Sequence, residues 1–278
     1  MRRNGGLQRG RAGAGRPNYS APALEKGLDV LELLAGASEG LTHTVIAQRL
    51  GRSVQEVYRM VRALERRGYI VRRAPDGSFW LSMKLYQLAT AFPPVRLLTV
   101  RATPLMQRLA REVQQAVLLS VLEGASIWPI VYVDSPAHVG FRVRLGTPSP
   151  AARTASGRVL LAFQDPAARP SSCRMLAESL DPASFRRVTA RIEAVRARGF
   201  ELVADETIRG VTDVSFPVLD GNGVALAALT MPFLETVSNP VSLDKAGRLL
   251  FAAAAELSEA AGGRLVRPAF PLTSMARG

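Results

Sequence analysis

The sequence predicts an α+β fold in about two domains, and three observations support this. The chain has 278 residues, of which 47% are hydrophobic, enough for more than one apolar core. Up to about residue 68, apolar residues recur at helical spacing. After about residue 115, short apolar runs between turn residues alternate with helical segments. This is typical of a mixed or antiparallel sheet with helices on its faces.

Two helices are expected near the N-terminus. Ser20 is a favourable N-cap residue, and Pro22 would lie in the first turn of the helix that follows. The apolar residues of this helix fall on one face: Leu24, Leu28, Leu31 and Leu34. Thr42 should cap a second, short helix that ends at Gly51.

The third helix is the most strongly marked. Ser53 and Glu56 have the spacing of a capping box, and Gly68 has the position of a C-terminal glycine. Its buried stripe should consist of Val54, Val57, Val61 and Leu64. Strands at 69–71 and 79–81 follow, with a turn at Asp76-Gly77 between them. Three helices and a β-hairpin make a winged helix-turn-helix, which we assign to residues 20–82.

Residues 83–94 are expected to form a linker helix, which Pro93-Pro94 should interrupt at the domain boundary. The second domain is assigned to 95–263, between a basic arm at 1–19 and a tail at 264–278. Its late strands should form a hairpin around Asp220-Gly221-Asn222-Gly223. The expected helices lie at 95–114, from Gly157 onward, at 184–198 and at 243–261, and the expected strands at 116–122, 127–133, 141–145, 214–219 and 224–231.

Positive charge is concentrated in the first domain and in the arm. The net charge is +13, and residues 49–73 hold eight arginines against Glu56 and Glu65. Such a local excess is a candidate footprint for phosphate groups. The arm at 1–19 carries five arginines and no acidic residue, so it either contacts nucleic acid or is a solvated tail.

The third helix should present its polar face to DNA, because the second helix of a helix-turn-helix lies in the major groove. Arginine can pair with guanine and glutamine with adenine. The candidate base-reading residues are Ser53, Gln55, Glu56 and Arg59. The candidate phosphate contacts are Arg62, Arg66, Arg72 and Arg73. Thr42 and Tyr58 complete the predicted DNA-binding set.

At this point the sequence resembles the IclR family of bacterial transcriptional regulators, over about residues 20–262. In the first half, residues 57–64 (VYRMVRAL) followed by Gly68-Tyr69-Ile70 carry the resemblance. In the second half, the family signature is matched by Gly146, Pro150, Thr154-Ala155, Gly157 and Leu161-Ala162. Later family landmarks are matched by Arg198-Gly199-Phe200, Glu206, Gly210-Val211 and Pro217-Val218.

The resemblance implies a GAF-like C-terminal domain that binds a small-molecule effector, and homodimers or homotetramers on a palindromic operator in double-stranded DNA. Carried over by position, the candidate effector-binding residues are Leu119, Thr154, Ala155, Gly157, Asp213, Ser215 and Thr230. The chain departs from the family pattern with Arg158 in place of lysine, Leu81-Ser82 in place of Leu-Gly, and Asp213 where cysteine is frequent.

Asp213 bears on the kind of effector. Many family members sense small acids, and a carboxylate in the cavity would repel an anion. Either Asp213 is paired, with Arg153 or Arg209, or the effector is not a simple anion. We therefore expect a neutral or cationic small molecule.

Other functions find little support in the sequence. There is no metal-ligand spacing around the two histidines, no nucleophile motif and no phosphate-binding loop, so we expect no metal, no cofactor and no catalytic residue. The single Cys173 and the lack of a secretory leader or of a long apolar run predict a cytoplasmic protein that does not engage a membrane. A transcriptional regulator is the leading hypothesis. A winged helix that binds another protein and an enzyme based on the second domain are the alternatives.

Overall fold

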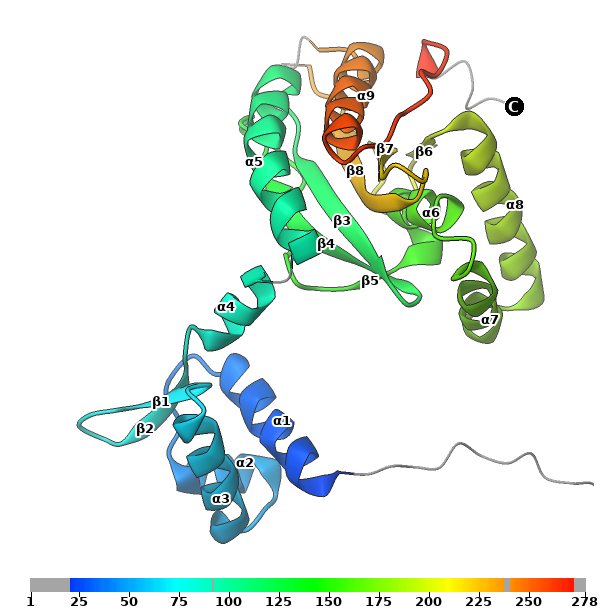
Figure 1. Ribbon diagram of the computed structural model, residues 1–278. Helices are drawn as coiled ribbons and strands as arrows, with labels where there is room; N and C mark the ends of the chain where they lie inside the picture. Colours follow the sequence, from blue (N-terminus) through cyan, green and yellow to red (C-terminus); the bar gives the residue numbers. More distant parts are fainter. Residues whose placement is uncertain (1–20, 92, 238–240, 273–278) are drawn as a thin grey trace, which may run out of the picture. The chain divides into compact units, whose positions relative to one another are not determined.

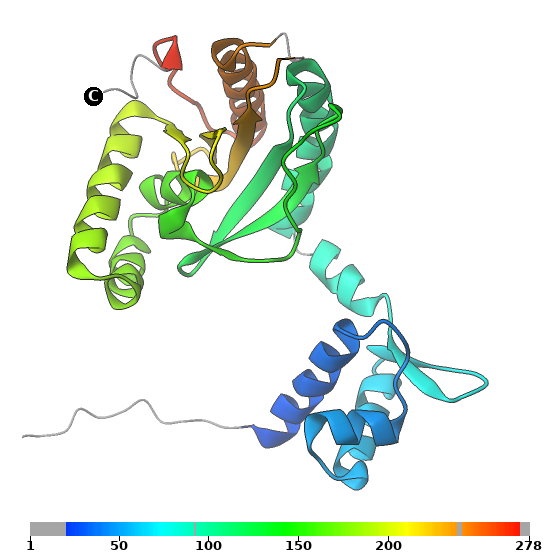
Figure 2. The same ribbon diagram turned by 180° about the vertical axis from the view of Figure 1, so that it is seen from behind.

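The computed structural model describes residues 21–91, 93–237 and 241–272. The chain divides into an N-terminal unit, 1–91, and a C-terminal unit, 92–278, which are considered separately. The predicted α+β class and the winged helix-turn-helix are both confirmed (Figures 1 and 2). The predicted basic arm and the end of the predicted tail fall outside the described residues.

The N-terminal unit packs three helices against a short hairpin. Its elements are α1 (Pro22–Ala35), α2 (His43–Leu50), α3 (Val54–Arg66), β1 (Ile70–Arg73), β2 (Ser78–Leu81) and α4 (Lys84–Ala91). The core between them contains Val30, Leu34, Leu41, Ile46, Val57, Val61, Ile70 and Phe79. Leu41 and Phe79 exchange two backbone hydrogen bonds, of 3.1 and 2.9 Å, which join the wing to the segment before α2.

The first helix differs from the prediction in its start and its buried face. Ala21 occupies the N-cap position and makes no side-chain cap, and Ser20 lies outside the described residues. Leu24 and Leu28 are 64% and 47% exposed, because only the second half of α1 reaches the core, through Val30 and Leu34. At the start of α3, Val54 is likewise 48% exposed, since the first turn projects beyond the core.

Pro93 and Pro94 have a different role from the one predicted. A helix does form before them, α4, but the prolines begin the long helix α5 (Pro93–Val113) instead of interrupting a linker. The first turn of a helix tolerates proline, because its N–H groups have no intrahelical partner there.

The C-terminal unit is an antiparallel sheet of six strands with helices on both faces. Strand order is β5-β4-β3-β8-β7-β6. Figure 1 shows α5 and α9 on one face and α6 and α8 on the other. The strands are β3 (Val117–Glu123), β4 (Ser126–Val133), β5 (Ser149–Pro150), β6 (Glu201–Ala204), β7 (Val211–Leu219) and β8 (Ala225–Leu234). The helices besides α5 are α6 (Ala155–Ala162), α7 (Arg169–Ser179), α8 (Pro182–Arg198) and α9 (Leu243–Ala260), with a short 3-10 turn at Ala151–Arg153.

Each face of the sheet has its own core. On the α5 and α9 face, buried residues include Leu109, Leu119, Phe216, Leu229 and Leu250. On the α6 face they include Ile127, Leu160, Leu161, Ile192 and Val195. Strand alternation therefore assigns each residue of β7 to one of the two faces, with Val214, Phe216 and Val218 toward α9.

Four parts of the C-terminal unit differ from the prediction. The expected strand at 141–145 is irregular, and the short strand β5 pairs with β4 at this edge instead. The strands β5 and β6 and the helix α7 were not predicted. None of the described helices is long and apolar enough to cross a membrane.

Candidate functional site

The exposed face of α3 carries most of the predicted DNA-binding residues. Gln55, Tyr58, Arg59, Arg62 and Arg66 are all exposed along this helix. Arg62 forms a 2.9 Å ion pair with Glu65, one turn along the helix, at the surface. Such a pair contributes little to stability, so Arg62 is available to exchange Glu65 for a phosphate. The face thus combines cationic side chains with an amide that can read a base edge.

Ser53 and Glu56, predicted to read bases, are engaged in the N-terminal cap of α3. The Ser53 hydroxyl and the Glu56 carboxylate cap each other's backbone N–H groups, at 3.3 and 3.2 Å. Lys26 of α1, which the prediction did not include, donates a 2.6 Å hydrogen bond to Glu56. This bond and those from Ser53 lower the pKa of Glu56 to about 2. Gln55 and Arg59 therefore remain as the early residues of α3 whose side chains form no hydrogen bond or ion pair with the described residues.

Thr42 and the wing arginines are also held by local contacts. The Thr42 hydroxyl accepts a 3.4 Å hydrogen bond from the N–H of Val45 and caps α2, as predicted. Arg72 donates to the carbonyl of Gly77 across the turn, and the Arg73 guanidinium lies 4.7 Å from the ring centroid of Trp80. Contacts with the turn and with an aromatic ring keep both cations on the wing, where they remain exposed.

The C-terminal unit contains a cavity of about 110 Å³ on the α6 face of its sheet. The structure brings four of the predicted effector residues to its wall: Thr154, Ala155, Asp213 and Thr230. The rest of the lining is Leu118, Ser120, Ile127, Pro129, Phe141, Val143, Ser149, Ser156 and Thr207. Phe141 and Val143 come from the segment 141–145, which was predicted as a strand. The alternation of apolar residues in this segment therefore reflects side chains that face the cavity.

Three other predicted effector residues do not line this cavity. Leu119 is fully buried in the opposite core, because its neighbours Leu118 and Ser120 are the residues of β3 that face the cavity. The Ser215 hydroxyl lies behind the wall, 2.8 Å from that of Thr230. Gly157 allows α6 to approach the turn before it: a Cβ at this position would lie 2.1 Å from the carbonyl oxygen of Ala151.

Asp213 is the unpaired carboxyl of the cavity. Neither Arg153 nor Arg209 contacts it, and no other described residue forms a hydrogen bond or an ion pair with it. Burial, together with the negative charge of Glu206, raises the pKa of Asp213 to about 6, and the charge of Arg158 opposes this. The alternative that Asp213 is neutralised by an arginine partner is therefore wrong for the described residues.

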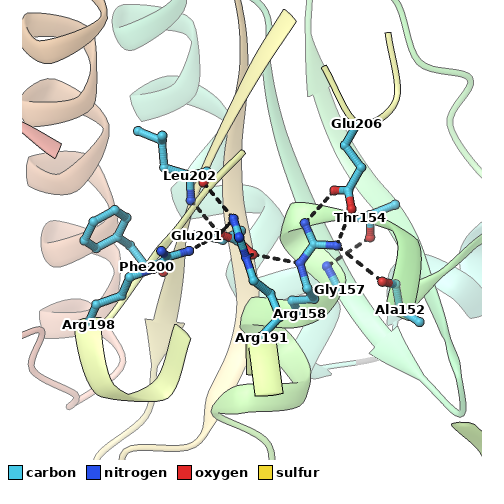
Figure 3. Close-up of polar contacts among 10 residues, drawn as sticks. All are labelled: Ala152, Thr154, Gly157, Arg158, Arg191, Arg198, Phe200, Glu201, Leu202 and Glu206. Atoms are coloured by element: carbon cyan, nitrogen blue, oxygen red, sulfur yellow. Dashed lines mark hydrogen bonds and ion pairs between the residues drawn. The ribbon is translucent and has the colours of Figure 1, made fainter. Parts of the chain in front are cut away.

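Arg158 is instead the centre of a buried ion-pair network that the prediction missed (Figure 3). Its Nε donates to Glu201 at 2.7 Å, and its two terminal nitrogens bind Glu206 at 2.9 and 2.5 Å. Glu201 is fully buried and also receives hydrogen bonds from Arg191 and Arg198. The planar guanidinium of Arg158 suits this double attachment, which a lysine could not make.

Replacing Asp213 with asparagine should stabilise the protein at neutral pH by about 2–3 kcal/mol. The folded carboxyl holds its proton up to about pH 6, whereas a free aspartate releases it near 3.9. The stabilisation by the protonated carboxyl is complete below about pH 4 and is lost as the pH rises through about 6. Urea unfolding of wild type and Asp213→Asn between about pH 4 and pH 7.5 measures the difference. A difference that stays the same across this pH range would contradict this prediction.

Comparison with known proteins identifies the relationship. The family model for the IclR helix-turn-helix domain matches residues 23–74, and the one for the bacterial transcriptional regulator IclR C-terminal domain matches residues 96–259, more than half of the chain. The glycerol operon regulatory protein of Streptomyces griseus is 29% identical over 212 residues, covering 74% of this chain and 82% of the relative. The regulator KdgR of Escherichia coli is 26% identical, covering 87% and 94%.

Solved structures share the fold. An IclR homologue from Microbacterium hydrocarbonoxydans, crystallised with 4-hydroxybenzoate, superimposes with a TM-score of 0.70 at 22% identity, covering 85% of this chain and 98% of the other. HmgR of Pseudomonas aeruginosa gives 0.66 at 24% identity, covering 86% and 99%. A winged helix-turn-helix joined to an α+β domain of this kind defines a bacterial transcriptional regulator. The chain belongs to the IclR family.

Proposed function

We propose that the protein binds an operator in double-stranded DNA through α3 and the wing, and that a small molecule in the C-terminal cavity changes its affinity for that operator. The observation that carries the proposal is the exposed face of α3, where Gln55 and Arg59 follow a complete N-terminal cap. The capping contacts fix the orientation of the helix, and the arginines of α3 and the wing supply the charge for phosphate contacts.

A homodimer or a homotetramer on a palindromic operator would fit the surface of the N-terminal unit. Leu24 and Leu28 on α1, and Leu85 and Leu88 on α4, are exposed apolar residues. Interfaces between subunits are commonly formed by contiguous patches of exposed apolar side chains, to which these helices would contribute. Two copies that read two half-sites would match the symmetry of such an operator.

Arg59→Ala should weaken binding to the operator by roughly 10- to 100-fold, which corresponds to about 1–3 kcal/mol for the loss of a base contact. Fluorescence anisotropy with labelled DNA from upstream of the protein's own gene, compared with scrambled DNA, measures this effect. Wild-type affinity should fall steeply with added salt, because phosphate contacts release counterions.

The control is Arg186→Ala, which removes one exposed positive charge from α8 in the other unit. It should change the affinity less than twofold, by a rough estimate for a charge outside the interface. Equal binding to both DNAs, unchanged in Arg59→Ala, would reject the proposal in favour of a winged helix that binds another protein.

A further inference from the structure

The cavity wall is apolar and hydroxyl-bearing, with a single ionisable group. Leu118, Ile127, Phe141 and Val143 give it apolar walls, and among the described residues that line it Asp213 alone is charged. No lysine, arginine or histidine of the described chain is part of the lining. An anion placed there would lose its hydration without meeting a counter-charge, which is strongly unfavourable.

Arg158, the arginine whose charge lowers the pKa of Asp213, is not free to bind an anionic ligand. All three nitrogens of the Arg158 guanidinium donate hydrogen bonds, to Glu201, Glu206 and the carbonyl of Ala152. Two carboxylates thus share this cation. The charge of Glu206 raises the pKa of Asp213 by more than the charge of Arg158 lowers it. The electrostatic environment of the cavity is therefore that of an uncompensated carboxyl group.

Hydroxyl groups that line the cavity together with Asp213 have unused capacity to accept hydrogen bonds. Ser120, Ser156 and Thr207 line the cavity, and their hydroxyls make no hydrogen bond with the described residues. An ammonium group has three donors and no acceptor. One carboxylate and neighbouring hydroxyl oxygens are the partners that such a group requires.

We propose that the effector cavity takes a small primary amine with a compact apolar body, its ammonium group on Asp213 and its body between Phe141, Val143 and Leu118. This proposal rests on the proposed function, which takes the cavity as the effector site, and it adds the chemical class of the ligand. The volume of about 110 Å³ limits the size. A cavity of about 150 Å³ holds one benzene ring, so a compact amine of about four or five heavy atoms suits this volume.

Three probes of nearly equal size and shape test the proposal: isobutylamine, isobutanol and isobutyrate. Binding to the full chain is measured by ligand-observed NMR titration at about pH 7.5, where Asp213 is ionised. Isobutylamine should bind at least tenfold more tightly than isobutyrate, with isobutanol between them. Asp213→Asn should remove the preference for the amine and leave the alcohol unchanged, whereas the exposed control Asp165→Asn should bind all three as wild type does.

The pH gives a second, independent readout. The charged groups that act on Asp213 are Glu206, from the segment after β6, and Arg158, from α6; its strand neighbours Val203 and Pro232 carry no charge. Affinity for isobutylamine should rise from about pH 5 to pH 7.5 as Asp213 ionises, and this rise should be absent in Asp213→Asn. Tighter binding of isobutyrate, or no binding of the amine in the millimolar range, overturns the proposal.

The operator assay separates this proposal from the proposed function. If the amine binds through Asp213 and leaves DNA affinity unchanged, the ligand class stands and the effector role fails. If isobutyrate binds and changes DNA affinity, the effector role stands and the ligand class is wrong. Reciprocity requires that an amine that weakens DNA binding is itself bound more weakly when DNA is present, by the same factor.

Discussion

Replacing Glu201 with glutamine should destabilise the C-terminal unit by about 3–5 kcal/mol, the usual cost of removing one partner from a buried ion pair. Glu201 is fully buried and accepts hydrogen bonds from Arg158, Arg191 and Arg198. Burial acts to raise its pKa, but the hydrogen bonds from Arg191 and Arg158 and the charges of Arg158 and Arg198 lower it overall. Glutamine keeps the shape and one acceptor but leaves the guanidinium groups without this counter-charge.

Urea unfolding at neutral pH measures the loss, and Glu193→Gln is the matched control. Glu193 lies on α8 and pairs with Arg196 at the surface, where its side chain is 65% exposed. Its replacement should change the free energy of unfolding by no more than about 0.5 kcal/mol. If the two variants lose the same small amount, the network around Glu201 does not stabilise the fold.

Gly157→Ala should destabilise the C-terminal unit by about 3 kcal/mol or more, at the upper end of the range for overpacking. The added Cβ would lie 2.1 Å from the carbonyl oxygen of Ala151 and 2.4 Å from its Cα. These are backbone atoms, so no side-chain rotation relieves the clash. The N–H of Gly157 also donates a 3.1 Å hydrogen bond to the hydroxyl of Thr154, which caps α6. A shift of α6 would therefore displace Thr154, and with it one wall of the cavity.

The corresponding substitution Gly27→Ala is expected to increase stability. Gly27 lies inside α1, and a Cβ there would meet nothing within 4 Å. Alanine should stabilise the N-terminal unit by about 0.5–1 kcal/mol, through its higher helix propensity. Thermal unfolding followed by circular dichroism compares the two variants. A Gly157→Ala protein that unfolds at the wild-type temperature would show that α6 can move away from Ala151 at little cost.

Local signals made much of the fold predictable from sequence. The capping box at Ser53 and Glu56, the Asp76-Gly77 turn and the Asp220–Gly223 hairpin are decided by residues close together in the chain, and all three form as predicted. Helix α7 gave a weak signal, because it buries only Ser172 and Leu176. The segment 141–145 alternates like a strand, but alternation reports which side chains turn inward and not whether a neighbouring strand pairs with the backbone.

The residues of the effector cavity were harder to predict, because periodic patterns do not report which distant segments lie together. Residues 116–122 are apolar at nearly every position, so a period of two could not show that Leu118, and not Leu119, faces the cavity. Arg158 binds Glu201 and Glu206, which lie 43 and 48 positions away in the chain, beyond the reach of any periodic pattern. Arg198 and Glu206 match landmarks of the family and Arg158 departs from its pattern, yet only the structure shows that the three residues belong to one cluster.

Strand β7 has an evolutionary consequence. Val214, Phe216 and Val218 point into one core, while Asp213 and Ser215 point to the other side. Because successive residues face opposite sides of a sheet, selection can alter position 213 without changing the packing of its neighbours. If Asp213 selects the ligand as proposed, a single codon change there would alter the class of ligand on an inherited scaffold. Diversification of chemical sensing within such a lineage would then require few mutations and little loss of foldability.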